Sequence, residues 1–88
     1  MENEQRTFDP TRRKTGFALR LYDLRWNRLR LTQRGFAERY NLGQRTIRDL
    51  EQGVSNPTPA MRLIVAAIDR DPAWMQEAAK MVVQSNAQ

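Results

Sequence analysis

The chain has 88 residues, a length at which we expect one small domain with a single core. It contains no cysteine and no histidine, which excludes disulfides, thiol chemistry and the usual zinc sites and removes the commonest general base of enzymes. The formal net charge of +5 favours a partner that carries phosphates.

The positive charge is concentrated in the middle of the chain. Residues 1 to 14 carry +1, residues 15 to 56 carry +4, and residues 57 to 88 carry 0. A localised basic surface is expected of a nucleic-acid-binding protein. A solvated arginine face would give the same count, so charge alone leaves both interpretations open.

Signals for a membrane or for secretion are not visible. No apolar run approaches the ~18 to 20 residues that cross a bilayer, and the first ten residues, MENEQRTFDP, are acidic and polar where a secretory signal is basic and then apolar. We expect a cytoplasmic protein without a membrane partner, metal or cofactor. An enzyme is not expected, because no nucleophile is accompanied by a base.

The first 14 residues predict a flexible arm. They contain one aromatic residue, Phe8, and an Asp9-Pro10 turn signal among polar groups. The basic residues at the end of this arm could touch DNA, as arms do in some recognition modules. The alternative is an exposed charged terminus without a function.

The first predicted helix runs from about Gly16 to Arg28. Trp26 falls off its apolar stripe, and we expect it to pack against the carboxy-terminal part of the chain; partial exposure at an interface is the alternative. Either Arg25 or Arg28 is expected to pair with the inward-facing Glu51, although contact with DNA is equally open. The stripe consists of Phe17, Leu21, Leu24 and the stem of Arg28.

The segment from Leu31 to Pro57 predicts two short helices joined by a tight turn, in the manner of a helix-turn-helix. The first begins at the cap Thr32 and ends near Tyr40, and the second runs from about Gln44 to Gln52. Asn41 marks the turn, because asparagine tolerates a left-handed backbone. The buried positions expected in the two helices are Leu31, Phe36, Ala37, Tyr40, Leu42, Ile47 and Leu50.

Glycines lie at the ends of the second of these helices and in the first turn of the first. Gly43 is expected to cap the second helix, and Gly53 to end it in a left-handed conformation. Gly35 stands where a capping-box glutamate would normally lie, and it should cost ~1 kcal/mol relative to alanine. We therefore expect the first of the two helices to begin poorly.

Two further helices follow, each opened by a cap and a proline. The first begins at Thr58-Pro59 and runs to about Asp69, and the second follows Asp71-Pro72 and runs from Ala73 to about Gln84. We expect the first of them to be a central helix, apolar on several sides. Its apolar residues are Met61, Leu63, Ile64, Val65, Ala67 and Ile68, and the last helix has Trp74, Ala78, Met81 and Val82 on one face with Met75 and Ala79 beside them.

The outward residues of the helix that begins at Gln44 have the chemistry of base contacts. A helix that enters the major groove with its amino-terminal end presents its first two turns to base edges. Glutamine can read adenine and arginine can read guanine through paired hydrogen bonds. The candidates are Gln44, Arg45, Arg48 and Asp49; Asp49 could accept from cytosine or simply pair with Arg45, one turn away.

Phosphate contacts are expected on either side of these residues, where they would supply most of the affinity. Gln33 and Arg34 lie at the amino end of the preceding helix. The complete set of phosphate candidates is Gln33, Arg34, Thr46, Gln52 and Asn56.

The pattern LTQ…A…TI…LE.G…NP in this region resembles the lambda repressor-like, Cro/XRE family of helix-turn-helix proteins. The resemblance covers about half of the chain and implies an all-α, five-helix domain that dimerises on a two-fold operator, with its third helix in the major groove and Gln33 on a phosphate. The departures are Arg34-Gly35, Asn41 and Gly43. The matching residues are Leu31, Thr32, Gln33, Ala37, Thr46, Ile47, Leu50, Glu51, Gly53, Asn56 and Pro57.

The ending NPTPAMRLIVAAIDRDP is similar to small antitoxins of the HigA kind, which implies a toxin protein as a further partner. We therefore expect an arm over residues 1–14, a DNA-binding domain over 15–70 and a carboxy-terminal helix over 71–88. The leading hypothesis is a repressor that binds double-stranded DNA as a homodimer. The alternative is an antitoxin or adaptor that binds protein through the last helix; its interface candidates are Trp74, Met75, Ala78, Met81 and Val82.

Overall fold

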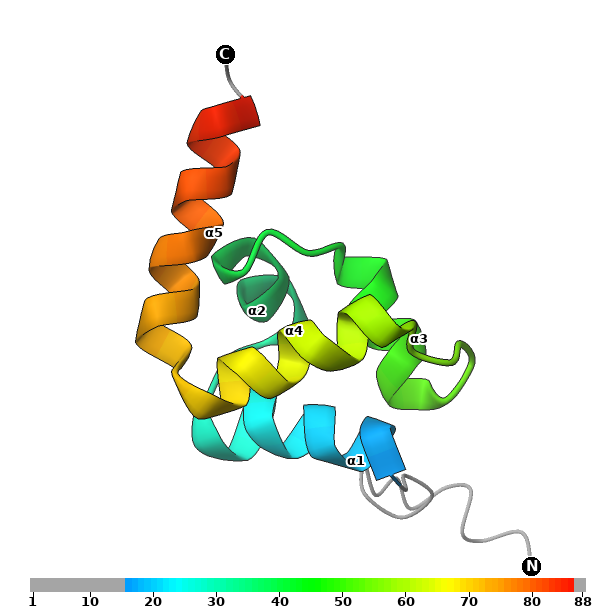
Figure 1. Cartoon of the computed structure of the whole chain (residues 1–88). Coiled ribbons are helices and arrows are strands. Elements are labelled where there is room, and N and C mark those ends of the chain that lie inside the picture. Colours follow the sequence, from blue (N-terminus) through cyan, green and yellow to red (C-terminus); the bar gives the residue numbers. More distant parts are fainter. Residues whose placement is uncertain (1–15, 87–88) are drawn as a thin grey trace, which may run out of the picture.

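The computed structural model describes residues 16–86, which are helical with no strand among them (Figure 1). The expectation of an all-α fold is confirmed for this part of the chain, and the arm predicted over residues 1–14 lies outside it. The elements are α1 (Gly16–Tyr22), η2 (Asp23–Arg28), α2 (Gln33–Arg39), α3 (Gln44–Gln52), α4 (Pro59–Arg70) and α5 (Pro72–Asn86).

The helices surround one core, and α5 projects from it. In Figure 1, α1 and η2 form a single rod below α4, α2 lies above α4, and α3 stands at the right beside the beginning of α4, joined to α2 by a short connection. The closest packing is of α3 against α1 and α2, and of α4 against α5. The α5 helix rises along one side and extends beyond the other helices.

The core combines side chains from every element except α5. The buried positions expected in the two short helices are confirmed for Phe36, Ala37, Tyr40, Ile47 and Leu50, while Leu31 and Leu42 pack partly buried against them. Burying one such large side chain stabilises the fold by about 1.5 to 3 kcal/mol. The other buried apolar residues are Leu21, Leu24, Val65 and Ile68.

Three side chains cap helices as expected. The Thr32 hydroxyl accepts from the Gly35 N–H at 2.9 Å, the Thr58 hydroxyl from the Met61 N–H at 3.1 Å, and the Asp71 carboxylate from the Trp74 N–H at 3.1 Å. A Cβ at Gly35 would lie 3.2 Å from the Thr32 hydroxyl oxygen. Glycine therefore leaves room for the cap, which offsets the poor start expected for α2.

The turn residues predicted from sequence adopt left-handed backbone. Asn41, between α2 and α3, has φ 57°, and Gly53, after α3, has φ 77°. The Gly53 N–H donates to the main-chain oxygens of Asp49 and Leu50, which ends α3 at Gln52. Arg30 also has a positive φ, of 58°, and nothing in the sequence predicted it.

The first predicted helix is present from Gly16 to Arg28, but the expectation that the stem of Arg28 belongs to its apolar stripe was wrong. From Asp23 it continues as the π-helical segment η2, which ends with the Leu29 N–H donating 3.0 Å to the Leu24 oxygen, five residues back. The wider turn rotates Arg28 off the apolar stripe, so Arg28 is exposed and Arg25 is buried instead.

Two other expectations about apolar side chains were wrong. Trp26 is not buried by packing but remains 41% exposed beside the Arg25 guanidinium, which lies 5.9 Å from its ring centroid. Leu63 is 70% exposed, because α4 turns only one side, with Val65 and Ile68, to the core. The α4 helix is thus amphipathic and not buried on several sides.

No helix within residues 16–86 is both long and apolar enough to cross a membrane.

Candidate nucleic-acid interface

The α3 helix has a buried side, here called its back, and an exposed side that carries Gln44, Arg45 and Arg48, here called its front. Ile47 and Leu50 are buried in the core, which fixes the rotation of the helix. Gln44, Arg45 and Arg48 are exposed on its other sides, and the Arg45 side chain is 82% accessible. Three of the four predicted base-contacting residues therefore reach solvent from the first two turns of one rigidly packed helix.

Asp49, the fourth candidate, lies between the two arginines. Its carboxylate oxygens are 3.8 Å from the Arg45 Nε and 3.8 Å from the Arg48 Nε. The predicted Arg45–Asp49 pair is thus confirmed as a long ion pair. Pairs of this length at a surface contribute little stability, so Asp49 limits the net charge of the front without locking either guanidinium in place.

Arg34, a predicted phosphate contact, already has a partner in α2. Its Nε donates to Glu38 at 2.9 Å, and both side chains are largely exposed. This hydrogen bond, together with the charge of Glu38, raises the pKa of the Arg34 guanidinium. Sequence reasoning missed Glu38, although its i,i+4 spacing from Arg34 is a recognisable signal.

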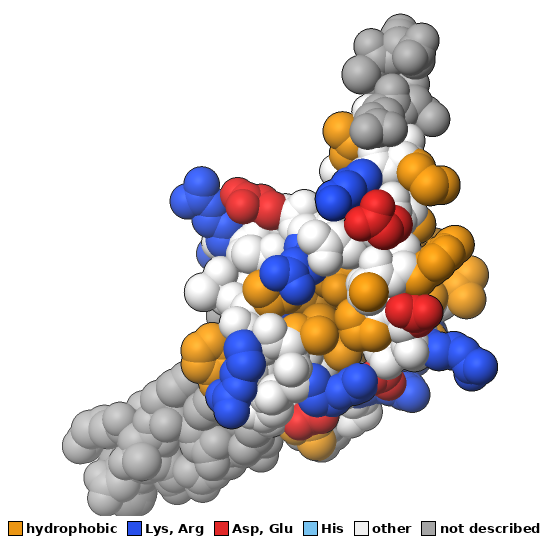
Figure 2. Space-filling model, turned by 90° about the vertical axis from the view of Figure 1, so that its left-hand side faces the viewer, with side chains coloured by type: hydrophobic (Ala, Val, Ile, Leu, Met, Phe, Trp, Pro, Cys, Tyr) orange, Lys and Arg blue, Asp and Glu red, His pale blue; other side chains and the backbone are white. Residues whose placement is uncertain are grey.

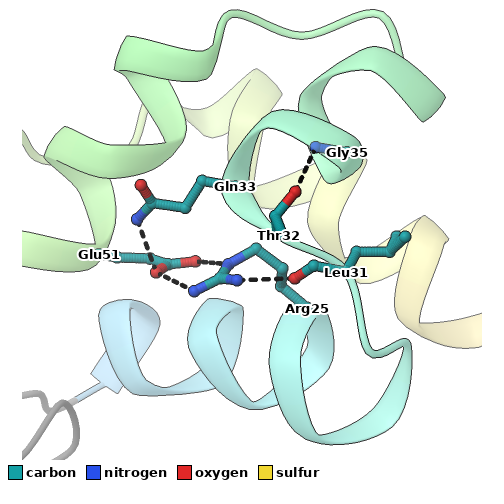
Figure 3. Close-up of polar contacts among 6 residues, drawn as sticks. All are labelled: Arg25, Leu31, Thr32, Gln33, Gly35 and Glu51. Carbon is teal, nitrogen blue, oxygen red and sulfur yellow. Dashed lines mark hydrogen bonds and ion pairs between the residues drawn. The ribbon is translucent and has the colours of Figure 1, made fainter.

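Gln33, the other candidate in α2, is joined to α3 by a hydrogen bond to Glu51, which also forms a buried ion pair with Arg25 (Figure 3). The Gln33 Nε2 donates to Glu51 Oε1 at 3.2 Å. Arg25 donates to the same carboxylate through Nε at 2.6 Å and Nη2 at 2.9 Å, and through Nη1 to the Leu31 oxygen at 2.7 Å. Of the two arginines considered for Glu51, Arg25 is therefore its partner.

Arg28, the other arginine considered, pairs instead with Asp69 at the end of α4. This pair joins η2 to α4.

The remaining phosphate candidates are exposed but lie at both ends of α3. Thr46 is in its first turn, Gln52 is its last residue, and Asn56 is in the loop that follows. With a rise of 1.5 Å per residue, Thr46 and Gln52 are separated by ~9 Å along the axis of α3. These candidates are therefore spread along the helix and the loop after it and do not form one cluster.

Three of the five predicted interface residues of α5, Met75, Ala78 and Val82, line one wall of an apolar groove, and Trp74 and Met81 are not part of its lining. Trp74, Met81 and Val82 are 61, 59 and 50% exposed, whereas Met75 and Ala78 are half-buried. Hydrophobic side chains gather on this face and continue along α5 (Figure 2). The groove has a volume of about 250 Å³ and is lined by Tyr40, Asn41, Leu42, Ile64, Met75, Ala78, Ala79 and Val82.

The connection between α2 and α3 supplies the opposite wall of this groove, which sequence reasoning missed. Tyr40 and Leu42 were expected only as core residues, and Asn41 only as a turn. The Tyr40 hydroxyl donates to the Pro72 oxygen at 3.1 Å and so joins the end of α2 to the start of α5. No local sequence signal indicates this long-range contact.

Comparison with protein-family models, with curated proteins and with solved structures gives no match for this chain.

Proposed function

We propose that this protein is a sequence-specific DNA-binding regulator in which α2 and α3 act as a helix-turn-helix. The front of α3 is the observation that supports this most directly. It presents Gln44, Arg45 and Arg48 on a helix whose back is held by buried Ile47 and Leu50. In this proposal α3 enters the major groove, and each well-placed bidentate contact contributes ~1 to 3 kcal/mol of base discrimination.

The charge of the region fits the same function. Residues 15–56 carry +4 of the total charge. Arg34 is exposed at the surface, and its pair with Glu38 is of the kind that contributes little to stability. A phosphate can therefore replace or share that carboxylate at small cost, and release of counterions from DNA would favour the exchange.

We further propose that the protein acts as a homodimer on a two-fold operator, with a second copy packed on the groove beside α5. One short recognition helix gives limited discrimination, and two copies would read half-sites ~34 Å apart. The residues that line the groove carry no charge. The charged residues of α5, Glu77 and Lys80, pair with each other at 3.4 Å. Two copies of a basic chain can thus approach through α5 without repulsion at this helix.

Selection of bound sites from a random pool of DNA duplexes tests this proposal. The expected product is a palindrome, because two identical subunits read two identical half-sites. A palindrome would support both the DNA contact and the symmetry. Recovery of no common sequence would contradict specific recognition, and a single unrepeated half-site would contradict the homodimer.

The second candidate function is an antitoxin or adaptor that binds another protein through α5. The apolar groove and the exposed Trp74, Met81 and Val82 favour it, since such a surface also suits a toxin protein or another partner. An adaptor has no need of three exposed base-reading side chains on α3. Charge reversal or removal at Arg45 and Arg48 would leave an adaptor's binding unchanged but would abolish operator recognition.

A further inference from the structure

Glu51 is a buried acidic residue close to the proposed DNA contacts. It lies on α3 at the end of the proposed recognition helix, is 2% exposed, and contacts Gln33 of α2. An isolated buried carboxylate is costly, and a negative charge close to a phosphate contact opposes DNA binding. Its presence therefore needs an explanation beyond packing.

The charge of Glu51 is compensated within the fold. Arg25 donates two hydrogen bonds to its two oxygens, and the side chains of this pair are 8% and 2% exposed. The third donor of Arg25 is satisfied by the Leu31 oxygen. No buried polar side-chain atom in the described part of the chain lacks a partner. The pair thus carries no net charge, and each of the three guanidinium nitrogens donates a hydrogen bond.

This pair holds one side chain that reaches toward solvent. Gln33 is half-buried, and its amide nitrogen has two hydrogens, one of which is donated to Glu51 (Figure 3). The other hydrogen is available to an acceptor outside. Because Glu51 accepts from the amide nitrogen, the side chain is oriented with its donor group, rather than its carbonyl, fixed at this position.

We propose that Glu51, supported by Arg25, is a positioning residue that presents the second amide hydrogen of Gln33 to a DNA phosphate. The inference rests on the proposed function and specifies how its phosphate contact is built. We call the hydrogen-bonded set of Gln33, Glu51 and Arg25 the clamp. Since Glu51 belongs to α3 and Gln33 to α2, the clamp also fixes the position of the phosphate contact relative to the base-reading Arg48, which lies one turn before Glu51. Gln33 then loses little side-chain entropy on binding.

A double-mutant cycle with Gln33→Ala and Glu51→Gln tests this role. Binding is measured with a duplex carrying the sequence that the wild-type chain recovers from a random pool. Each single variant should bind about ten-fold more weakly, as expected for loss of one hydrogen bond to a charged group. The double variant should bind no more weakly than Gln33→Ala, because Glu51 acts through Gln33.

The matched control is the cycle of Arg34→Ala with Glu51→Gln. Arg34 is a phosphate candidate outside the clamp, so its effect should multiply with that of Glu51→Gln. If the effects of Gln33→Ala and Glu51→Gln also multiply, Glu51 has only a structural role and the inference is overturned. Circular dichroism of each variant establishes that it is folded at the temperature of the binding measurement.

A second measurement on the unaltered chain does not depend on the folding of a variant. The two side-chain amide hydrogens of Gln33 give separate NMR signals, and addition of the duplex should shift the one that is not bonded to Glu51 more strongly. Equal or absent shifts while DNA binds would overturn the inference alone. Absence of DNA binding by the wild-type chain would overturn the proposed function and the inference together.

Discussion

Arg30 is held in a left-handed conformation, with φ 58°, directly after η2. The left-handed region costs a residue with a side chain ~1 to 2 kcal/mol, and asparagine less than most. Asn41, with φ 57°, could for that reason be predicted from its residue type and place. Arg30 could not, because arginine has no preference for this conformation and the way η2 ends imposes it.

Replacing Arg30 by glycine should stabilise the protein. Relief of the left-handed strain exceeds the added entropy of glycine in the unfolded chain, so we expect a gain of about 0.5 to 1 kcal/mol in the free energy of unfolding. Urea denaturation measures it. Arg20→Gly, within α1, is the matched control and should instead lose about 1 kcal/mol. A similar loss at both positions would mean that Arg30 is unstrained.

Ionisation of the Tyr40 hydroxyl should make the stability of the fold depend on pH in the alkaline range. Burial raises the pKa of its hydroxyl above the ordinary value of 10.0, an effect that the nearby Arg39 opposes. Below pH 10 the tyrosine is neutral in both states, and its contribution is complete. Above it the unfolded chain ionises first, so stability is lost as the pH rises toward the folded-state pKa.

The Tyr40→Phe variant isolates this contribution. It should be less stable than the wild type by about 1 kcal/mol at pH 8, because the hydrogen bond to the Pro72 oxygen is lost. The difference should shrink as the pH passes 10. Urea denaturation at pH 8 and pH 10.5 measures both values, and Tyr22→Phe is the matched substitution. A difference that is constant with pH would contradict the account of Tyr40.

At the scale of elements, the ends of helices could be predicted better than their interiors. Thr32, Thr58 and Asp71 cap helices through contacts within three residues, which local sequence specifies. The π-helical form of η2 was not predictable, because its turn is coupled to the burial of Arg25 against Glu51, 26 residues away. The same distant contact determines the orientation of Gln33.

The buried ion pair between Arg25 of η2 and Glu51 of α3 should matter for stability as a pair, so that removing one partner costs more than replacing both. Glu51→Leu leaves Arg25 buried without its counter-charge and should cost about 3 to 5 kcal/mol of stability. Adding Arg25→Met should recover most of that loss, since an apolar pair can replace a buried ion pair. Urea denaturation of the two variants checks this. A double variant no more stable than Glu51→Leu would contradict it.

At the scale of the whole molecule, the all-α class and the positions of the helices along the chain could be predicted from the spacing of apolar residues and from helix caps. The groove beside α5 did not, because three separate parts of the chain form it: the α2–α3 connection, α4 and α5. Leu63 shows the same limit, since its spacing fits a buried stripe but the packing of α4 leaves it exposed.

Dimerisation should depend on this groove. Val82 lines it, and Val82→Glu would place a charge in an apolar contact, which is costly when desolvated. Sedimentation equilibrium should give a dimer for the wild type and a monomer for Val82→Glu. Val54→Glu, at a 70% exposed residue of the loop after α3, is the control and should remain dimeric. A dimeric Val82→Glu variant would place the interface elsewhere.

The central claim is that the front of α3 reads DNA sequence, and the ratio of affinities for the selected operator and a scrambled duplex tests it most directly. For Arg45→Ala with Arg48→Ala, this ratio should fall to about one while the circular dichroism spectrum is unchanged, because loss of two bidentate contacts removes the discrimination. Arg34→Ala should weaken binding to both duplexes equally and reduce the salt slope by ~1. A ratio that stays at the wild-type value without Arg45 and Arg48 would contradict the claim.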